Sequence, residues 1–394
     1  MINYTEARTI VRSKAHSFGT ETIPLEQSYG RVLTGVVRAD RDYPPFDRAT
    51  MDGYALRAID LQQGIRAFHI IETIFAGDIA SRQLSAGECY KIMTGASVPA
   101  GADMIVRRED TIEEGSVVRI RTETIRPFLN IARQGEDIRS GDTVIDSPCM
   151  VEPAIIGLLA SLGQKEVTVA RLPRIALITT GNEIVSVETQ PGPAQIRNSN
   201  RWLLQAFLKK WQIGPCLYQH VPDDKTLLRT AIDKALSADV VILCGGVSAG
   251  DADHVPEMLE AAGVTRLFHK LAIKPGKPVW CGNGPDDTMV FALPGNPFSC
   301  LVGFILLIQP YLQACFGLPD NALLSLPLGT AKKKYTPLDE FFPVRMHGAP
   351  VRLLPASLNG SGDIRLGMQA NALALHPAEV QALEEGTPTI YFPL

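Results

Sequence analysis

The stretch ADVVILCGGVSAGDADHVPEMLEAAG (residues 238–263) combines three patterns that together decide the fold. An apolar run, VVILC, has the length and composition of a buried strand. A glycine-rich turn follows it, and then a segment with the periodicity of an amphipathic helix. A strand, a glycine turn and a helix in this order are typical of α/β proteins with a parallel sheet.

The same alternation extends on both sides, from about residue 174 to 320. Further strands are predicted at RIALITTG (174–181), PCLYQHV (215–221), RLFHKLAI (266–273), PVWCG (278–282) and TMVFALPG (288–295). Helices are predicted over residues 198–214 and 223–237, and a long apolar helix from Pro297 to about Phe316. The pattern indicates a mostly parallel sheet with helices on both faces.

The rest of the chain is rich in short strands. Residues 5–18 predict an amphipathic helix and residues 152–163 a second helix that ends at Gly163. Short apolar runs broken by glycine and proline fill the region between these helices, and they return in the last 75 residues or so. Strands this short with such frequent turns indicate two small β domains.

Composition narrows the class of protein. The chain has 394 residues, 45% of them apolar, and 38 basic residues against 42 acidic ones for a net charge of −4. Its longest basic run is AKKKY (331–335), so we expect neither a nucleic-acid partner nor a membrane surface. The seven cysteines show neither zinc spacing nor a disulfide framework, and the N-terminus has no apolar signal core. These features predict a cytoplasmic protein of several domains.

Four glycine-containing loops follow the predicted strands. They are GNE (181–183), GGVSAGDAD (245–253), KPGK (274–277) and PGNPFS (294–299). Ligands of such sheets bind at the carboxyl ends of the strands, so the four loops should meet there. Taken singly, each is more typical of ordinary turn chemistry, and lysines on a tight turn can serve solubility alone.

Together the loops predict an anion site. Glycine lets Gly245, Gly246 and Ser248 turn backbone N–H groups toward a ligand. A helix N-terminus after Pro294 and Asn296 adds free N–H groups and a dipole, with Ser299 in its first turn. Full positive charge comes from the lysines of KLAIKPGKPVW (270–280), namely Lys270, Lys274 and Lys277. We therefore predict a phosphate or another oxyanion at this edge.

Carboxylates at the same edge indicate a second ligand. Glu183, Asp223, Asp251 and Asp253 all follow predicted strands. Acidic groups beside bound phosphate commonly hold Mg²⁺, which takes one or two carboxylates together with phosphate oxygens. The alternative is that Asp251 or Asp253 caps the next helix. We assign capping to one of these two residues and metal binding to the other.

Seven motifs carry a resemblance to a known family. In chain order they are PPFDRATMDGYAL (44–56), KIMTGASVPAGADMIVRRED (91–110), RQGEDI (133–138), ITTGNEI (178–184), CGGVSAGDAD (244–253), LAIKPGKP (271–278) and LPGNPFS (293–299). Their order and content resemble the molybdenum insertases, the molybdopterin molybdotransferase family that includes MoeA and the E domain of gephyrin. The resemblance extends from residue 1 to about 320 and is looser beyond.

The resemblance implies four domains. These are an α/β domain similar to the Mog-type adenylyltransferases (1–19 and 170–320), a linker domain (20–38 and 141–169), a projecting β-rich lobe (39–140) and a C-terminal β domain (321–394). It also implies an elongated homodimer whose cleft lies between the α/β domain of one subunit and the lobe of the other. An upstream molybdopterin adenylyltransferase would be a pathway partner.

The implied reaction inserts molybdate into adenylylated molybdopterin, releases AMP and depends on a divalent cation. By resemblance Asp253 matches the catalytic position, where it would hold the metal or position water. Glu183, Asp223 and Asp137 match acidic positions for metal or substrate, and Asp52 and Thr94 are their counterparts in the lobe. Lys270, Lys274, Lys277 and Ser299 would hold phosphate or molybdate, with Arg133 and Ser361 as further binding residues.

Three positions depart from the family pattern. Asn182 stands where aspartate is usual, His254 replaces an aromatic residue, and NGSGDIRLGMQANAL (359–373) matches only in part. Two interpretations other than an insertase are weighed. GGVSAG and MDGYA disfavour the adenylyltransferase itself, whereas Asn182 leaves open a relative that binds the cofactor without inserting metal. A scaffold of the gephyrin type would need a trimerising domain.

Overall fold

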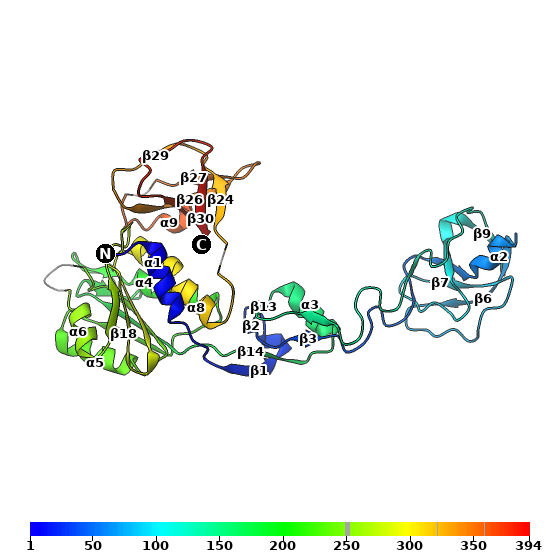
Figure 1. Cartoon of the computed structure of the whole chain (residues 1–394), viewed down its shortest axis with the longest axis horizontal. Helices are drawn as coiled ribbons and strands as arrows, with labels where there is room; N and C mark the ends of the chain where they lie inside the picture. The colour runs from blue at the N-terminus through cyan, green and yellow to red at the C-terminus, as the bar shows by residue number, and fades with distance from the viewer. Residues whose placement is uncertain (249–252, 321, 358) are drawn as a thin grey trace. The chain divides into compact units, whose positions relative to one another are not determined.

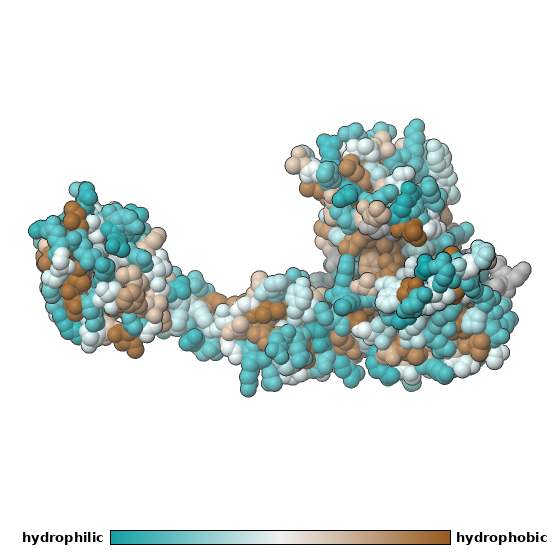
Figure 2. All heavy atoms as spheres, turned by 180° about the vertical axis from the view of Figure 1, so that it is seen from behind, coloured by the Kyte–Doolittle hydropathy of each residue, from teal (hydrophilic) through white to brown (hydrophobic). Residues whose placement is uncertain are grey.

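A computed structural model describes residues 1–248, 253–320, 322–357 and 359–394. The chain folds into two compact units. Unit 1 contains Met1–Thr34, Pro148–Ile156 and Glu166–Leu394, and unit 2 contains Gly35–Ser147 and Gly157–Lys165. On the face drawn in Figure 2 the surface of each unit is mainly hydrophilic, with apolar residues in scattered places.

The α/β sheet of unit 1 has six strands in the order β18-β15-β19-β23-β22-β20. Its strands are β15 (Ile175–Thr180), β18 (Leu217–Val221), β19 (Val240–Cys244), β20 (Thr265–His269), β22 (Trp280–Asn283) and β23 (Met289–Leu293). Only β22 runs against the others. The mostly parallel sheet expected from the sequence is confirmed, and its carboxyl edge gathers the four glycine loops.

Helices cover both faces of this sheet (Figure 1). On one face pack α1 (Tyr4–Ser13), α4 (Ser199–Lys209) and the apolar helix, and on the other pack α5 (Lys225–Ala235) and α6 (Val255–Ala261). Alternate residues of β15 divide between the two cores: Leu177 faces α4, whereas Ile178 faces α5. Burial on both sides explains why these strands are apolar throughout.

The apolar helix consists of three segments, α7 (Pro297–Gly303), the π-helical η4 (Phe304–Ile308) and α8 (Gln309–Cys315). Within the described ranges, this run is the one helix long and apolar enough to span a bilayer. Its span window is 89% buried inside the fold, so the run is a core helix of unit 1.

Two predicted elements are shorter than expected. α1 ends at Ser13 rather than at residue 18, because the Lys14 N–H bonds back to Val11 and Arg12 in a tight final turn. The strand predicted over 266–273 ends at His269, because Lys270 has a φ of 71° and turns the chain. The next two residues, β21 (Ile273–Lys274), join the C-terminal sheet instead.

The C-terminal sheet therefore contains a strand from the α/β region. Its order is β21-β26-β28-β30-β24, and β27 pairs with β26. The added strands are β24 (Leu324–Pro327), β26 (Asp339–His347), β27 (Arg352–Pro355), β28 (Ala372–His376) and β30 (Pro388–Pro393), beside the short pair β25 (Lys332–Lys333) and β29 (Ala382–Leu383). Phe341 packs into the same core as Val11, so this sheet and the α/β layer share buried contacts.

A small antiparallel sheet completes unit 1. Its order is β1-β14-β2-β13, from β1 (Thr20–Pro24), β2 (Val32–Leu33), β13 (Cys149–Met150) and β14 (Glu166–Ala170). Helix α3 (Pro153–Ser161) follows β13.

Unit 2 includes the residues 39–140 for which a β-rich lobe is predicted, and it extends beyond them on both sides; the division into four domains stays a prediction. Its sheet has the order β8-β5-β7-β6-β10-β9, from β5 (Gly53–Leu56), β6 (Ala67–Ile74), β7 (Glu88–Ile92), β8 (Met104–Arg107), β9 (Thr111–Glu114) and β10 (Val117–Ile120). Two separate two-stranded sheets accompany it, β4–β11 (Arg48–Ala49 with Ile131–Ala132) and β3–β12 (Val37–Arg38 with Thr143–Ile145). Tyr54 and Ala55 lie in separate cores, so both faces are covered.

Candidate functional site

A cleft of about 1620 Å³ lies in unit 1 between the carboxyl edge of the α/β sheet and the C-terminal sheet. Pockets for single drug-sized ligands measure about 300–1,000 Å³, so this cleft has room for an extended ligand. It is lined by most of the predicted site residues of unit 1: Glu183, Asp223, Gly245, Gly246, Ser248, Asp253, Lys274, Lys277, Pro294, Asn296, Ser299 and Ser361. Lys270 does not line it, and its left-handed backbone belongs to the turn after β20.

The residues around the turn after β19 leave room only for glycine at its first two positions. Gly245 has a φ of 103°, and a Cβ there would come within 2.6 Å of Thr180 Oγ1. Gly246 has a φ of 66°, and its Cβ would meet Val255 at 2.8 Å. Larger residues are therefore excluded at both positions. Gly245 is buried and its N–H donates to the Leu293 carbonyl at 3.0 Å, so the prediction that this N–H is free to bind an anion is wrong.

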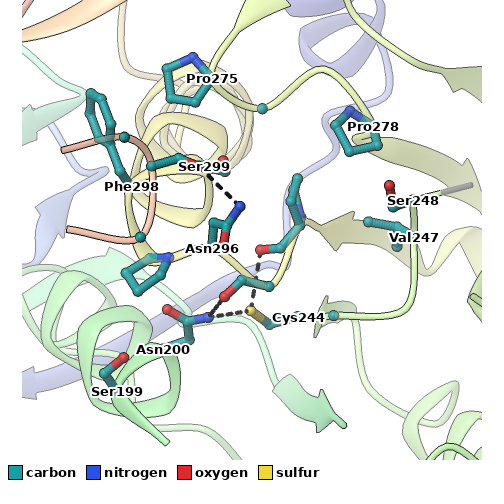
Figure 3. A pocket seen from close by; sticks show the side chains of 18 of the residues that line it. Ser199, Asn200, Cys244, Val247, Ser248, Pro275, Pro278, Asn296, Phe298 and Ser299 are labelled. Atoms are coloured by element: carbon teal, nitrogen blue, oxygen red, sulfur yellow. Dashed lines mark hydrogen bonds between the residues drawn. The ribbon is translucent and has the colours of Figure 1, made fainter. Parts of the chain in front are cut away.

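The start of α7 forms a second wall. Asn296 is the residue before the helix, and its Nδ2 donates to Ser361 Oγ at 3.0 Å (Figure 3). The N–H of Phe298 donates to the Ser361 carbonyl at 3.1 Å, and Ser299 is buried in the first turn. Ser361, which the sequence aligned only loosely, is thus attached to the helix start by two hydrogen bonds.

Asn200 fixes the loop before α7, and the sequence did not single it out. Its Nδ2 donates to the Gly295 carbonyl at 2.5 Å and to Cys244 Sγ at 3.1 Å (Figure 3). Cys244 also contacts the Pro294 carbonyl and Cys300, each at 3.6 Å. The asparagine therefore joins the start of α4 to the ends of β19 and β23. Its only signal in the sequence is a polar residue near the start of an amphipathic helix.

We expect Asn200→Ala to lower both stability and activity. Two hydrogen bonds are lost, one of them to the buried Cys244, which costs about 1–2 kcal/mol of unfolding free energy. The freed Gly295 carbonyl lets the helix start shift, and we expect about a tenfold loss in transferase turnover, since small misplacements of binding groups are costly. Urea unfolding and turnover measure the two effects.

Thr288→Val is the matched control. The buried Thr288 hydroxyl bonds the carbonyls of Leu236 and Ala238 at the opposite edge of the same sheet. This variant should lose similar stability and keep full turnover. Equal turnover losses in both variants would show that Asn200 acts on stability alone.

Two carboxylates of the cleft are held by the loops after β15 and β18. The Asn182 N–H donates to Asp223 Oδ2 at 3.2 Å, and the Asp223 N–H donates to Asn182 Oδ1 at 3.1 Å. Either asparagine or aspartate can accept this bond through Oδ1, so Asn182 preserves the link between the loops while removing one negative charge. Glu183 is exposed beside it.

The third carboxylate precedes α6. The helix begins at Val255 with His254 as its N-cap residue, and His254 makes no side-chain capping bond. Asp253, half-buried, lies one position earlier and lines the cleft, whereas Asp251 lies outside the described residues. A capping role for one of the two aspartates thus stays a prediction.

A divalent cation would find oxygen ligands here but not a closed cage. Among the described residues no three or more His, Cys, Asp or Glu side chains form a metal-binding group. Glu183, Asp223 and Asp253 nevertheless line one cleft with the lysines. Because Mg²⁺ needs only one or two carboxylates when phosphate oxygens and water complete its shell, this donor set suits a cation bound together with a phosphorylated ligand.

The C-terminal sheet supplies a wall that the sequence did not predict. Lys332 Nζ and Glu340 Oε1 form an ion pair at 2.8 Å, and both residues line the cleft. Lys332 Nζ also lies 4.7 Å from the centre of the Phe342 ring. Ile364, 81% exposed, adds apolar surface to the same cleft. Strand pairing creates this wall, so neither motif nor spacing indicated it.

The predicted lobe residues lie in unit 2 and are all exposed. Asp52 Oδ1 accepts the N–H and the hydroxyl of Thr94, each at 2.7 Å. These bonds, the backbone one first, hold the pKa of Asp52 below its usual value, and the Arg108 charge adds to the effect. Arg133 stacks over Phe128, and Asp137 follows on the same loop. The structure thus brings Asp52 and Thr94 together in unit 2, and their role in the reaction stays a prediction.

We expect Thr94→Val to raise the pKa of Asp52 toward that of free aspartate. The variant keeps the backbone N–H and loses the hydroxyl donor. A depressed carboxyl pKa stabilises the fold above the unfolded pKa, and that stability is lost as the pH falls through the folded pKa. The stability difference from the native protein should therefore be present at neutral pH and vanish in acid.

Carboxyl-carbon NMR titration measures the pKa directly. Thr111→Val is the control, because the Thr111 hydroxyl bonds a backbone carbonyl, that of Arg108. An unchanged Asp52 pKa in Thr94→Val would contradict the assigned cause.

Comparisons with known proteins agree on one family. Residues 2–163 match the MoeA N-terminal region (domains I and II), and residues 176–314 match a probable molybdopterin binding domain. The chain is 32% identical to a molybdopterin molybdenumtransferase of Staphylococcus epidermidis over 92% of this chain and 88% of that protein. It is 34% identical to one of Synechocystis over 98% of each.

Solved structures extend the likeness to the whole fold. Two crystal structures of molybdopterin biosynthesis MoeA protein from Pyrococcus horikoshii match 100% of this chain, with TM-scores of 0.80 and 0.85 at 31% and 27% identity. Sequence, family and fold coincide over nearly the full length. The chain therefore belongs to the MoeA family of molybdopterin molybdenumtransferases, transferases of molybdenum cofactor biosynthesis.

Proposed function

We propose that this transferase inserts molybdate into adenylylated molybdopterin and releases AMP, with help from a divalent cation. One observation carries the proposal: lysines, a helix start and three carboxylates line a single cleft large enough for an extended phosphorylated ligand. Such a site can neutralise an oxyanion and act on the phosphoanhydride beside it.

The cationic part of the cleft would hold molybdate or phosphate. Lys274 and Lys277 are exposed on the turn between β21 and β22. Ser248, Asn296, Ser299 and Ser361 line the cleft beside these lysines and add side-chain hydrogen-bond donors. Charge-assisted hydrogen bonds to a tetrahedral oxyanion are the strongest that these groups can make.

The acidic part of the cleft would act on the bond that links AMP to the pterin phosphate. Asp253, Glu183 and Asp223 would hold the cation, and Asp253 would also orient the attacking water. When bound, the cation would neutralise charge that develops on the phosphate oxygens. Lys274 would stabilise the same charge from the other side of the ligand, which is the usual source of rate in phosphoryl chemistry.

The lobe would complete the site from a second copy of the chain. Asp52, Thr94, Arg133 and Asp137 are exposed side chains suited to a polar ligand, and we propose that they reach the cleft of the partner in a homodimer. Mixing an inactive Asp52 variant with an inactive Asp253 variant should then restore part of the activity, through mixed dimers with one intact cleft. Failure of mixed dimers to recover activity would argue against a shared cleft.

The pathway context follows from the substrate. An adenylyltransferase must supply the adenylylated pterin, and we place both enzymes in the cytoplasm. The test is AMP release by the purified full-length chain from adenylylated molybdopterin, with and without molybdate and Mg²⁺. Release that requires both additions supports the proposal. Substrate that binds but stays intact would favour a relative that binds the cofactor without inserting metal.

A further inference from the structure

We propose that Lys332 and Glu340 recognise the pyrimidine edge of the pterin, an inference that rests on the proposed function. No motif or family resemblance pointed to these residues. Lys332 lies on β25, which pairs with β29 in a separate two-stranded sheet, and Glu340 lies on β26 of the C-terminal sheet; both residues line the cleft.

The position of the pair is set by strand pairing. Glu340 is in register with Lys274 on the neighbouring parallel strand β21. The carboxylate therefore stands one strand away from the predicted oxyanion site. On β26, Glu340 and Phe342 are two residues apart and so share a face, where Lys332 Nζ contacts both.

Stability alone is a poor reason for such a pair. The Lys332 and Glu340 side chains are 18% and 17% exposed. Charges withdrawn this far from water lose much of their hydration, and the ion pair regains little net free energy. Both residues line the cleft, and their ion pair joins Lys332 Nζ to a single carboxylate oxygen, Glu340 Oε1. A half-buried pair in this place suits recognition better than stabilisation.

The hydrogen-bonding pattern of the pair matches a pterin. The 2-amino-4-oxopyrimidine edge presents two N–H donors side by side, with a carbonyl acceptor next to them. An ionised carboxylate only accepts and can take both N–H groups, and the lysine can donate to the carbonyl. Adenine presents one donor beside an acceptor nitrogen, which would face a carboxylate oxygen. The pair thus favours the pterin half of the ligand over its adenine half.

The first test is equilibrium binding without molybdate, so that no turnover occurs. Adenylylated molybdopterin and AMP are titrated into native protein, Glu340→Gln and Lys332→Met. We expect Glu340→Gln to weaken the binding of adenylylated molybdopterin by about tenfold or more, and Lys332→Met to weaken it several-fold. The affinity for AMP should be unchanged in both variants. Equal losses of affinity for the two ligands, or no loss of affinity for adenylylated molybdopterin, would overturn the proposal.

A charge exchange separates recognition from stability. Lys332→Glu combined with Glu340→Lys keeps an ion pair, so the melting temperature should return toward that of the native protein. Pterin binding should stay weak, because the donor and acceptor pattern is reversed. Recovery of binding along with stability would mean that the pair is structural. Glu385→Gln, which breaks the exposed Arg352 pair of the same domain, is the control and should change neither affinity.

The outcomes distinguish this inference from the proposed function. If native protein binds the pterin ligand but releases no AMP when molybdate is added, the proposed function fails while the recognition result stands. If native protein releases AMP and Glu340→Gln binds normally, this inference alone is wrong.

Discussion

Asp253→Asn should reduce AMP release by about 10²–10³-fold, the loss expected when one group that stabilises transition-state charge is removed. The substitution keeps the size of the side chain and removes its charge. Asp253 is half-buried and lines the cleft one residue before the N-cap of α6. In the proposed mechanism Asp253 acts on the reacting phosphate, so its loss should appear in kcat, with substrate affinity changed much less.

A control carboxylate lies in the same α/β region. Asp233 is exposed on α5 and pairs with Arg229 outside the cleft. Asp233→Asn should release AMP at the native rate. Near-native release by Asp253→Asn would remove this residue from the chemistry and shift attention to Glu183 and Asp223.

Gly53→Ala should destabilise unit 2 by about 3 kcal/mol or more. A Cβ at Gly53 would lie 2.0 Å from the Val106 carbonyl oxygen, a backbone atom that cannot rotate away. Gly53 pairs with Ile92 on one side and Arg107 on the other, in the interior of the sheet. The next residue toward the N-terminus is Asp52, so its bond to Thr94 should be lost as well.

Two spectroscopic signals can follow the unfolding of the two units separately. All three tryptophans, Trp202, Trp211 and Trp280, belong to unit 1. In Gly53→Ala, circular dichroism should show an early transition that tryptophan fluorescence lacks. Gly157→Ala is the control, because its Cβ meets nothing within 4 Å in helix α3, and it should stabilise by about 0.5–1 kcal/mol. Native stability in Gly53→Ala would contradict the strand packing described for MDGYA.

The sequence predicted the α/β layer well because its signals are local. Strands such as VVILC are apolar throughout, and each is followed by a glycine turn and an amphipathic helix. Which loops share an edge then follows from parallel pairing, and Gly245, Lys274 and Asn296 were found in this way. MDGYA was different, because only the resemblance marked Asp52 as a functional residue.

The site residues that the sequence did not predict are brought together by contacts between segments far apart along the chain. Glu340 lies beside Lys274 because the chain leaves the α/β sheet after His269 and β21 pairs with β26, and no local pattern encodes that pairing. Asn200 was overlooked because its partners, Gly295 and Cys244, lie on other strands. Side chains that act through contacts far along the chain have no periodicity to reveal them.

The central claim is that this cleft couples molybdenum insertion to cleavage of the AMP bond. A single-turnover experiment with enzyme in excess over adenylylated molybdopterin tests it most directly, by counting AMP released and molybdenum bound to pterin at each time. We predict that the two appear together, one for one, and that neither appears without molybdate. AMP released without molybdate, or molybdenum bound with AMP still attached, would contradict the coupling.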